Sequence, residues 1–283
     1  MTALQQNSIG DSLQWAQRHL SGQVSDARLE AQLLLAHVLQ VPRTHLLAWP
    51  EKTITPASLA AFRQLVRRRR SGVPVAYLTG HKEFWSLPLK VSSATLIPRP
   101  ETETLVEVAL QLITDLPRPV IADLGTGSGA VALAIASERT DAWLLAADLS
   151  MTALQTARTN ARHLGLPQCR FALLDWCGGL ATQAFDLIVT NPPYIESTDP
   201  ALRQRELRFE PALALSSGKT GLHAIEQVCT GARTALKPGG WLALEHGWQQ
   251  KTAVIACLEE HNYRNINSFR DFAGHDRVCI AQV

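Results

Sequence analysis

The sequence predicts an α/β protein in which a small helical bundle precedes a doubly wound, mostly parallel seven-stranded sheet. From residue 101 onward, strand-like and helix-like segments alternate with short links, a pattern that favours parallel pairing. The last two expected strands, 267–272 and 277–283, are joined by only four residues, too few for a crossover, so they should pair antiparallel. Residues 10–72 show helical periodicity and no strand pattern.

The first domain is expected to span residues 1–80. Ser25 is the predicted N-cap of a helix whose apolar residues recur at spacings of four and three, and Thr55-Pro56 has the preferred order for starting another helix. That second helix should end at Arg67–Arg70, where cations meet the negative end of the helix dipole, before Gly72. We interpret the four arginines as a solvated helix end rather than a docking patch.

A β-hairpin linker is expected over residues 81–100. Short β-like runs between residues 83 and 91 are interrupted by Pro88, and Ile97-Pro98-Arg99-Pro100 should stiffen the chain that follows. For Arg99, Glu101 and Glu103 the sequence leaves two interpretations open: they rigidify the junction, or they form part of an active-site wall.

The second domain is expected over residues 101–283. Its predicted helices include one with Leu105, Val108 and Leu112 on one face, then 128–137, 150–164 and 222–236, and one more before residue 267. Its predicted strands are 120–124, 143–149, 170–175, 185–190, 241–245, 267–272 and 277–283. A parallel sheet that finishes with one reversed strand resembles the Rossmann-like fold of class I S-adenosylmethionine-dependent methyltransferases, an analogy at the level of fold alone.

Composition narrows the classes of protein. Hydrophobic residues make up 46% of the 283 residues and charged residues 18%, which excludes a disordered chain. The net charge of +2 supplies no global field for collecting nucleic acid, so we expect no stable nucleic-acid partner. The five cysteines include no C-x-x-C pair and the nine histidines no H-x-x-x-H pair, so neither a disulfide framework nor a metal site is expected.

We expect a cytoplasmic monomer. Residues 1–7 lack the basic start and apolar stretch of a secretory signal. The longest apolar run, 130–136, is far shorter than the roughly 20 residues that a membrane-spanning helix needs, so no membrane partner is expected either.

A glycine-rich loop joins the first predicted strand of the sheet to a helix. The loop, Asp123-Leu124-Gly125-Thr126-Gly127-Ser128-Gly129-Ala130, stands where free backbone N–H groups and the helix dipole hold a carboxylate or phosphate. Its spacing also satisfies the dinucleotide fingerprint G-x-G-x-x-G/A, and Asp148 ends the next strand, where an acid binds ribose hydroxyls. A nicotinamide-dependent dehydrogenase is therefore an alternative.

Charge favours a different cofactor. Asp123 would face the pyrophosphate of a dinucleotide, whereas S-adenosylmethionine brings an ammonium and a sulfonium to this place. Asp175 and Trp176, at the end of the third strand, could then bracket the adenine by hydrogen bonding and by stacking. A tight structural turn and a buried core tryptophan are the competing interpretations.

Asn191-Pro192-Pro193-Tyr194 follows the fourth predicted strand. The Asn191 side-chain oxygen and the Pro192 carbonyl are acceptors held apart by two prolines, so they can take both hydrogens of a planar –NH2 group and aim its lone pair outward. Tyr194 offers a ring on which the substrate can stack. Beside the glycine loop, this tetrad indicates an N-methyltransferase rather than a Pro-Pro turn that only caps a strand.

Together these residues resemble the HemK/PrmC family, the N5-glutamine methyltransferases of peptide-chain release factors. The resemblance includes further signatures at 74–80 (PVAYLTG), 96–103 (LIPRPETE) and 209–211 (FEP). It implies methyl transfer from S-adenosylmethionine, leaving S-adenosylhomocysteine, to the glutamine of the Gly-Gly-Gln loop of class 1 release factors. It also implies that the helical domain recognises the substrate.

The resemblance assigns the site residue by residue. The implied cofactor-binding residues are Gly125, Thr126, Gly127, Ser128, Gly129, Asp148, Trp176 and Asn191. The implied substrate-binding residues are Asn191, Pro192, Pro193 and Tyr194, of which Asn191, Pro192 and Tyr194 are the catalytic ones.

Three alternatives stay open beside this function. An adenine or guanine amino methyltransferase acting on RNA or DNA would use the same tetrad, because it grips any planar –NH2 group. The others are the dehydrogenase and a non-catalytic binding module that keeps the fold. Phe209-Glu210-Pro211, after a polar loop that starts at Glu196, is expected to order when substrate enters.

Overall fold

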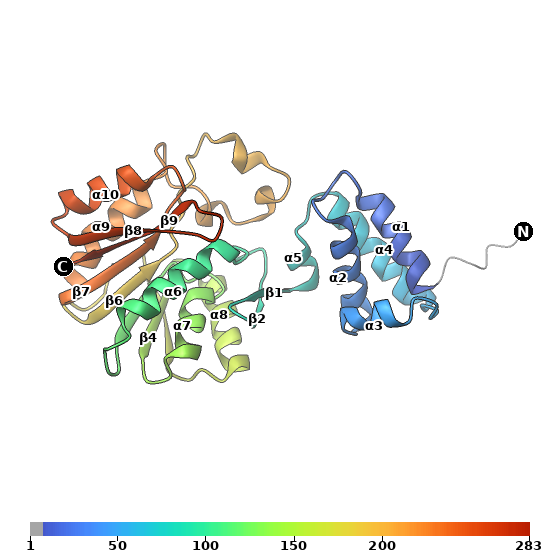
Figure 1. Cartoon of the computed structure of the whole chain (residues 1–283), viewed down its shortest axis with the longest axis horizontal. Helices are drawn as coiled ribbons and strands as arrows, with labels where there is room; N and C mark the ends of the chain where they lie inside the picture. Colours follow the sequence, from blue (N-terminus) through green and yellow to red (C-terminus); the bar gives the residue numbers. More distant parts are fainter. Residues whose placement is uncertain (1–7) are drawn as a thin grey trace, which may run out of the picture. The chain divides into compact units, whose positions relative to one another are not determined.

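The computed structural model describes residues 8–283 and divides the chain into two units (Figure 1). The first consists of residues up to Gly80 together with Arg205–Phe209, and the second of His81–Gln204 and Glu210–Val283. Residues 1–7, on which the expected absence of a secretory signal depends, lie outside the described residues.

The first unit is helical. Ile9, Leu13, Ala16 and Leu20 recur at spacings of three and four and are buried, so one face of the first helix packs on its neighbours. The helices are α1 (Ile9–Leu20), α2 (Ala27–Leu39), α3 (Arg43–Ala48), α4 (Pro56–Arg70) and α5 (Val75–Thr79).

Two helix starts test the predicted caps. Thr55 caps α4 by accepting a hydrogen bond from the backbone N–H of Ser58, with Pro56 at the first helical position, as predicted. The prediction of Ser25 as the cap of α2 is wrong by one residue: Asp26 Oδ1 accepts from the backbone N–H of Leu29 at 2.8 Å.

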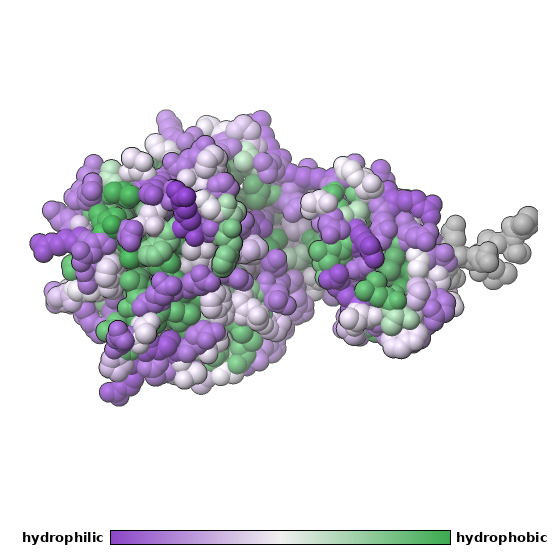
Figure 2. Space-filling view, in the orientation of Figure 1, coloured by the Kyte–Doolittle hydropathy of each residue, from purple (hydrophilic) through white to green (hydrophobic). Residues whose placement is uncertain are grey.

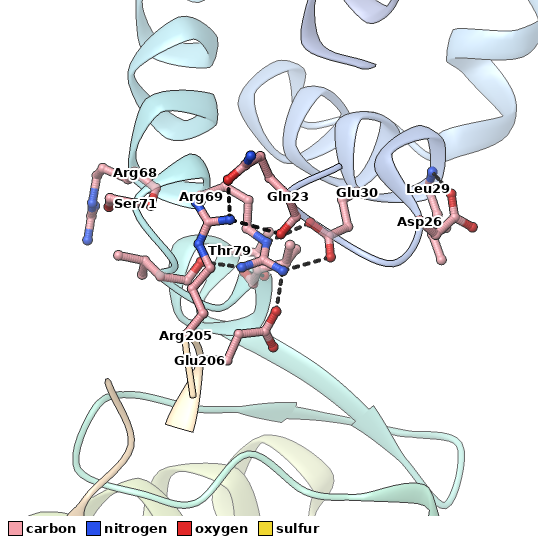
Figure 3. A network of polar contacts seen from close by, with 12 residues as sticks. Gln23, Asp26, Leu29, Glu30, Arg68, Arg69, Ser71, Thr79, Arg205 and Glu206 are labelled. Carbon is pink, nitrogen blue, oxygen red and sulfur yellow. Dashed lines mark hydrogen bonds and ion pairs between the residues drawn. The ribbon is translucent and has the colours of Figure 1, made fainter. Parts of the chain in front are cut away.

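The arginines at the end of α4 do not share one environment, so the prediction of a solvated helix end is wrong for Arg69. Its side chain is 2% exposed and is bound by Glu30 on α2, with Nε to Oε2 at 2.6 Å and Nη2 to Oε1 at 3.0 Å. Glu206 pairs with the same Nη2, and Arg205 Nη1 donates to the Gln23 carbonyl at 3.0 Å (Figure 3). These bonds hold Arg205–Phe209 on the helical unit, whereas Arg68 stays exposed.

The second unit begins with the expected hairpin, which is confirmed. Strands β1 (His81–Phe84) and β2 (Leu87–Lys90) pair antiparallel, and Phe84 and Leu89 are buried in the core. The hairpin is tied to α8 (Met151–Leu164) by Asn160, which accepts from the Lys90 backbone N–H at 2.8 Å and donates to its carbonyl at 3.0 Å. A 3-10 turn, η1 (Pro100–Thr102), then leads into α6 (Glu103–Leu112).

The sheet has seven strands in the order β5-β4-β3-β6-β7-β9-β8, and only β9 runs against its neighbours, so the prediction of one reversed strand is confirmed. The strands are β3 (Val120–Leu124), β4 (Trp143–Asp148), β5 (Cys169–Leu173), β6 (Phe185–Thr190), β7 (Leu236–Glu245), β8 (Arg264–Arg270) and β9 (Asp276–Gln282). The strand expected at 241–245 begins earlier, because Leu236 already pairs with Phe185 and residues 236–240 belong to β7.

Helices cover both faces of the sheet (Figure 1). Neighbouring strand residues alternate between two cores, as the period of two requires: Ile121 and Leu187 pack with α6 and α7, whereas Ala122 and Ile188 pack with α9 and α10. The remaining helices of this unit are α7 (Ala130–Glu138), α8 (Met151–Leu164), α9 (His223–Ala235) and α10 (Lys251–Glu260), with 3-10 turns η2 (Pro200–Arg203), η3 (Leu207–Phe209, held on the first unit) and η4 (Ala212–Ala214).

On the face drawn in Figure 2, hydrophilic side chains are interspersed with smaller hydrophobic areas. Across residues 8–283 no helix combines the length and the apolar character needed to cross a bilayer. The parallel strands β3, β4, β5 and β6 end at one edge of the sheet, which brings together the segments that follow them.

Candidate active site

A cavity of about 510 Å³ opens at this edge, a volume within the usual range of small-molecule sites. Eight predicted site residues line it: Gly125, Thr126, Gly127, Ser128, Asp148, Trp176, Asn191 and Pro193. The three that do not line it are Gly129, Pro192 and Tyr194. All of the lining residues belong to the second unit.

Two glycines of the loop are required for different reasons. Gly125 has φ +72°, and a Cβ there would lie 3.3 Å from the Trp176 ring, so only a bare backbone lets the ring cover the loop. Gly129 has φ +85° and caps α7, and a Cβ there would lie 3.0 Å from Leu133 and 3.2 Å from Ala157. Gly129 therefore shapes the loop from behind, and the cavity wall is formed by Gly125–Ser128.

Asp123 is a buried acid on the cavity wall. Its Oδ2 accepts from the Thr126 hydroxyl at 2.7 Å and from the Ala132 backbone N–H at 3.1 Å. Burial raises the pKa of Asp123 to about 7, because the charged form loses water and these two donors restore only part of the lost stabilisation. A cation bound in the cavity would stabilise the carboxylate, whereas a pyrophosphate would repel it.

Asp148 both shapes the loop and faces the cavity. Its Oδ2 accepts from the Gly127 backbone N–H and its Oδ1 from that of Ser150, each at 2.8 Å. Burial raises the pKa of Asp148 against the effect of these bonds. A carboxylate oxygen has a second lone pair, so both oxygens can still accept from a pair of vicinal hydroxyls.

Trp176 is half-buried, lies against Gly125 and lines the cavity. Its φ of +47° is unusual for a bulky residue, and such strain concentrates at functional sites. The ring supplies a flat apolar surface next to Asp175, which also lines the cavity and is exposed.

The tetrad after β6 presents its residues differently. Asn191 lines the cavity and its Nδ2 donates to the Thr102 hydroxyl at 3.1 Å, which leaves Oδ1 as an acceptor. Pro192 is buried, so its available group is the backbone carbonyl. Tyr194 packs against the core that includes α9 and α10, and its hydroxyl donates to Glu245 Oε1 at 3.3 Å, so its ring supports the loop from behind the cavity.

Arg99 and Glu103, whose roles the sequence leaves open, have different surroundings. Arg99 lines the cavity and pairs with Glu210, which also accepts from the Ile97 backbone N–H at 3.0 Å. Glu103 accepts from the Trp85 backbone N–H at 2.9 Å and therefore ties the hairpin to α6. Glu210 is buried with these partners, and the ordering of residues 209–211 on substrate entry stays a prediction.

Sequence reasoning missed Thr102 and Glu245. Thr102 lies inside the 96–103 signature, and Glu245 ends β7 next to the tetrad, but no spacing rule joins positions so far apart in the chain. Within residues 8–283, no three histidine, cysteine, aspartate or glutamate side chains are grouped so that they could hold a metal ion.

The residues present fit S-adenosylmethionine. A buried carboxylate suits its cationic end, Asp148 suits its ribose hydroxyls, and the approach of Trp176 to a bare Gly125 leaves a flat wall for its adenine. A dinucleotide would place its pyrophosphate against Asp123, so the dehydrogenase alternative fits this cavity poorly.

The chain is similar to known proteins along most of its length. Residues 11–80 match the family model described as the PrmC N-terminal domain, and residues 102–208 match the methyltransferase small domain. The release factor glutamine methyltransferase of Vibrio cholerae is 46% identical over 277 residues, covering 97% of this chain and 96% of the relative. That of Escherichia coli K12 is 45% identical over 255 residues, covering 90% and 92%.

A solved structure supports the fold. The ribosomal protein L11 methylase from Lactobacillus delbrueckii superposes with a TM-score of 0.50 at 18% identity, over 68% of this chain and 83% of that one. At this identity the likeness concerns the fold alone and not the substrate.

Proposed function

This chain belongs to the family of release factor glutamine methyltransferases, and we propose that it methylates the side-chain amide nitrogen of the glutamine in the Gly-Gly-Gln loop of class 1 peptide-chain release factors. The methyl donor is S-adenosylmethionine and the other product is S-adenosylhomocysteine. One observation carries the residue assignment: Asn191 shares a cavity with the buried acid Asp123, and its Nδ2 is already committed to Thr102.

The amide is a poor nucleophile because its lone pair is delocalised, so the site has to orient it. In our proposal Asn191 Oδ1 and the Pro192 carbonyl accept the two N–H groups, and Pro193 fixes their separation. Tyr194 supports this loop through its bond to Glu245. When bound, S-adenosylmethionine supplies an electrophilic methyl group on a cationic sulfur. Held in this way, the amide nitrogen would present its lone pair to that methyl group, and on methylation it would give one of its two protons to water.

The cofactor contacts are assigned in the same proposal. Gly125, Thr126, Gly127 and Ser128 receive the amino-acid end, and Gly129 keeps their backbone in place. Asp148 accepts from the ribose hydroxyls, Trp176 covers the adenine, and Asn191 contacts the cofactor as well as the substrate.

We also propose roles for the parts of the chain. Residues 1–80 form the domain that recognises the release factor, since one glutamine is too small a feature for selective binding, 81–100 form the linker, and 101–283 catalyse the reaction. We propose that the enzyme acts in the cytoplasm, where a release factor would meet it. We expect it to act as a monomer with no stable nucleic-acid partner, in keeping with its net charge of +2.

Methyl labelling tests this function. The protein is incubated with methyl-labelled S-adenosylmethionine and a class 1 release factor, and the digest is examined by mass spectrometry. We expect label on the Gly-Gly-Gln glutamine and none on a control factor in which that glutamine is alanine. Label on adenine or guanine of added RNA or DNA, with the release factor unlabelled, would instead favour the amino methyltransferase of nucleic acid.

A further inference from the structure

Glu245 is a buried acid next to the proposed substrate site that the reaction scheme above does not use. It ends β7, and because Leu244 pairs with Thr190, it stands beside the start of the tetrad at Asn191. The residue is 1% exposed. Among the described residues, its Oε2 is one of three buried side-chain atoms without a hydrogen-bond partner, and a buried carboxylate oxygen left in this way is costly.

One polar side chain of the tetrad, Tyr194, bonds to this carboxyl group directly, and the other, Asn191, bonds to Thr102. The Tyr194 hydroxyl donates to Oε1 at 3.3 Å. Asn191 Nδ2 donates to the Thr102 hydroxyl at 3.1 Å, and Thr102 in turn favours the ionised form of Glu245. A hydroxyl that accepts from an amide keeps its own hydrogen for another acceptor.

We propose that Glu245 is a positioning residue that acts through Thr102 to hold Asn191 with its side-chain oxygen toward the substrate amide. The oxygen end and the nitrogen end of a primary amide have nearly the same shape, but the first accepts hydrogen bonds and the second donates them. A fixed orientation of Asn191 therefore needs a partner that accepts and cannot donate. An ionised carboxylate at the end of the relay supplies this direction. The inference rests on the proposed function, because it concerns how that function's substrate amide is held.

Protonation of Glu245 would remove the preference for one orientation of Asn191. A neutral carboxyl group can donate to Thr102, which then lets the Asn191 side-chain amide flip by 180°. Burial raises the pKa of Glu245 to about 7, and Glu101 in η1 acts in the same direction. Arg277 on β9, Thr102 and Tyr194 act in the opposite direction by favouring the charge. The relay should therefore fail as the pH falls through about 7.

Substitutions at both ends of the relay test the inference. Glu245→Gln keeps the shape of the side chain and adds a donor, and Thr102→Val removes the hydroxyl, whereas Thr102→Ser keeps it. At saturating S-adenosylmethionine we expect kcat on the release factor to fall about 10- to 100-fold in Glu245→Gln and Thr102→Val, with little change in KM, because the protein substrate is gripped beyond its glutamine. Thr102→Ser should stay within about threefold of the unmodified enzyme.

Two further readouts separate positioning from a structural role. Circular dichroism and S-adenosylmethionine binding should be unchanged in all three variants, and the acid limb of the kcat profile near pH 7 should disappear in Glu245→Gln. Equal kcat in Thr102→Val and Thr102→Ser, or an unaltered pH profile in Glu245→Gln, would overturn the inference. The unmodified enzyme is assayed beside them: if it labels the glutamine and the variants match it, the positioning role alone is wrong, whereas failure to label the glutamine would overturn the function and the inference with it.

Discussion

Buried charges of the helical unit and of the methyltransferase unit are compensated differently. In the helical unit, Arg69 is bound by both carboxylate oxygens of Glu30 and by Glu206, so the guanidinium is fully compensated (Figure 3). In the other unit, Asp123 and Glu245 are buried with raised pKa values, and one oxygen of Glu245 has no partner within the described part of the chain.

The comparison distinguishes charges that stabilise the fold from charges that are placed for ligand binding or catalysis. Removing a paired buried arginine lowers the free energy of unfolding, because its partner acids lose the charge that compensates them. A buried acid without full compensation costs stability as long as it stays charged, and it is useful only if substrate or cofactor uses that charge. Removing the charge of Arg69 should therefore lower the free energy of unfolding, whereas removing the charge of Asp123 should raise it.

The largest effect on stability is expected from Arg69→Ala. It leaves the largely buried Glu30 without its partner and opens a cavity in the helical unit, whereas the half-exposed Glu206 is solvated by water, so we expect the free energy of unfolding to fall by about 3 kcal/mol. The matched control is Arg68→Ala, one residue earlier on the exposed face of the same helix, which should change it by less than about 0.5 kcal/mol. Denaturant unfolding followed by circular dichroism gives both values, and equal losses would mean that the Arg69 cluster does not hold the unit.

Asp123→Asn should act in the opposite direction. The pKa of an acid that is raised on folding, here from 3.8 to about 7, makes the folded state lose stability as pH rises from about 4 to about 7. At pH 8 the amide, which can still accept from Thr126, should raise the free energy of unfolding by about 1 kcal/mol. The control is Asp115→Asn on the exposed turn after α6, which should be neutral.

The same substitution should weaken S-adenosylmethionine binding about tenfold at pH 8, because one attractive charge is lost. In the unmodified protein, calorimetry should show affinity falling as pH drops below about 7, where Asp123 takes up its proton. The Asn variant should show no such dependence. An identical dependence in both proteins would remove Asp123 from cofactor recognition.

The smallest of these effects is expected at Trp176. Replacing it with Ala removes the wall over Gly125 but no charge, so the dissociation constant for S-adenosylmethionine should rise about 3- to 10-fold. Trp176→Phe keeps a ring and should recover part of the loss. If Trp176→Ala binds as tightly as the unmodified protein, the ring is a core residue and not a cofactor contact.

The sequence predicts best what depends on neighbouring residues. The strand predicted at 185–190 is β6 residue for residue, and the helix predicted at 150–164 is α8, which begins at Met151 with Ser150 as its cap. The glycine loop and the tetrad stand at strand ends, so their place at one edge of the sheet follows once the strands are parallel.

What the sequence could not predict depends on contacts between distant segments. Arg69 is paired with Glu206, which is 137 residues away, and an arginine run at a helix end gives no sign of this. Thr102 and Asn191 are 89 residues apart, and Glu245 is 51 residues from Tyr194, so the relay exists only after the strands are ordered. Tyr194 was expected to offer its ring to the substrate, a role that stays a prediction, although its hydroxyl is directed to Glu245.

The central claim is that this enzyme works by orienting an unreactive amide, and Asn191→Ala tests it most directly. Turnover on a class 1 release factor is measured at saturating S-adenosylmethionine, with cofactor binding and circular dichroism recorded on the same preparation. We predict turnover at least about 100-fold lower with folding intact and cofactor affinity nearly unchanged. Turnover equal to that of the unmodified enzyme would contradict the claim, because the amide would then be oriented without the side chain that we propose holds it.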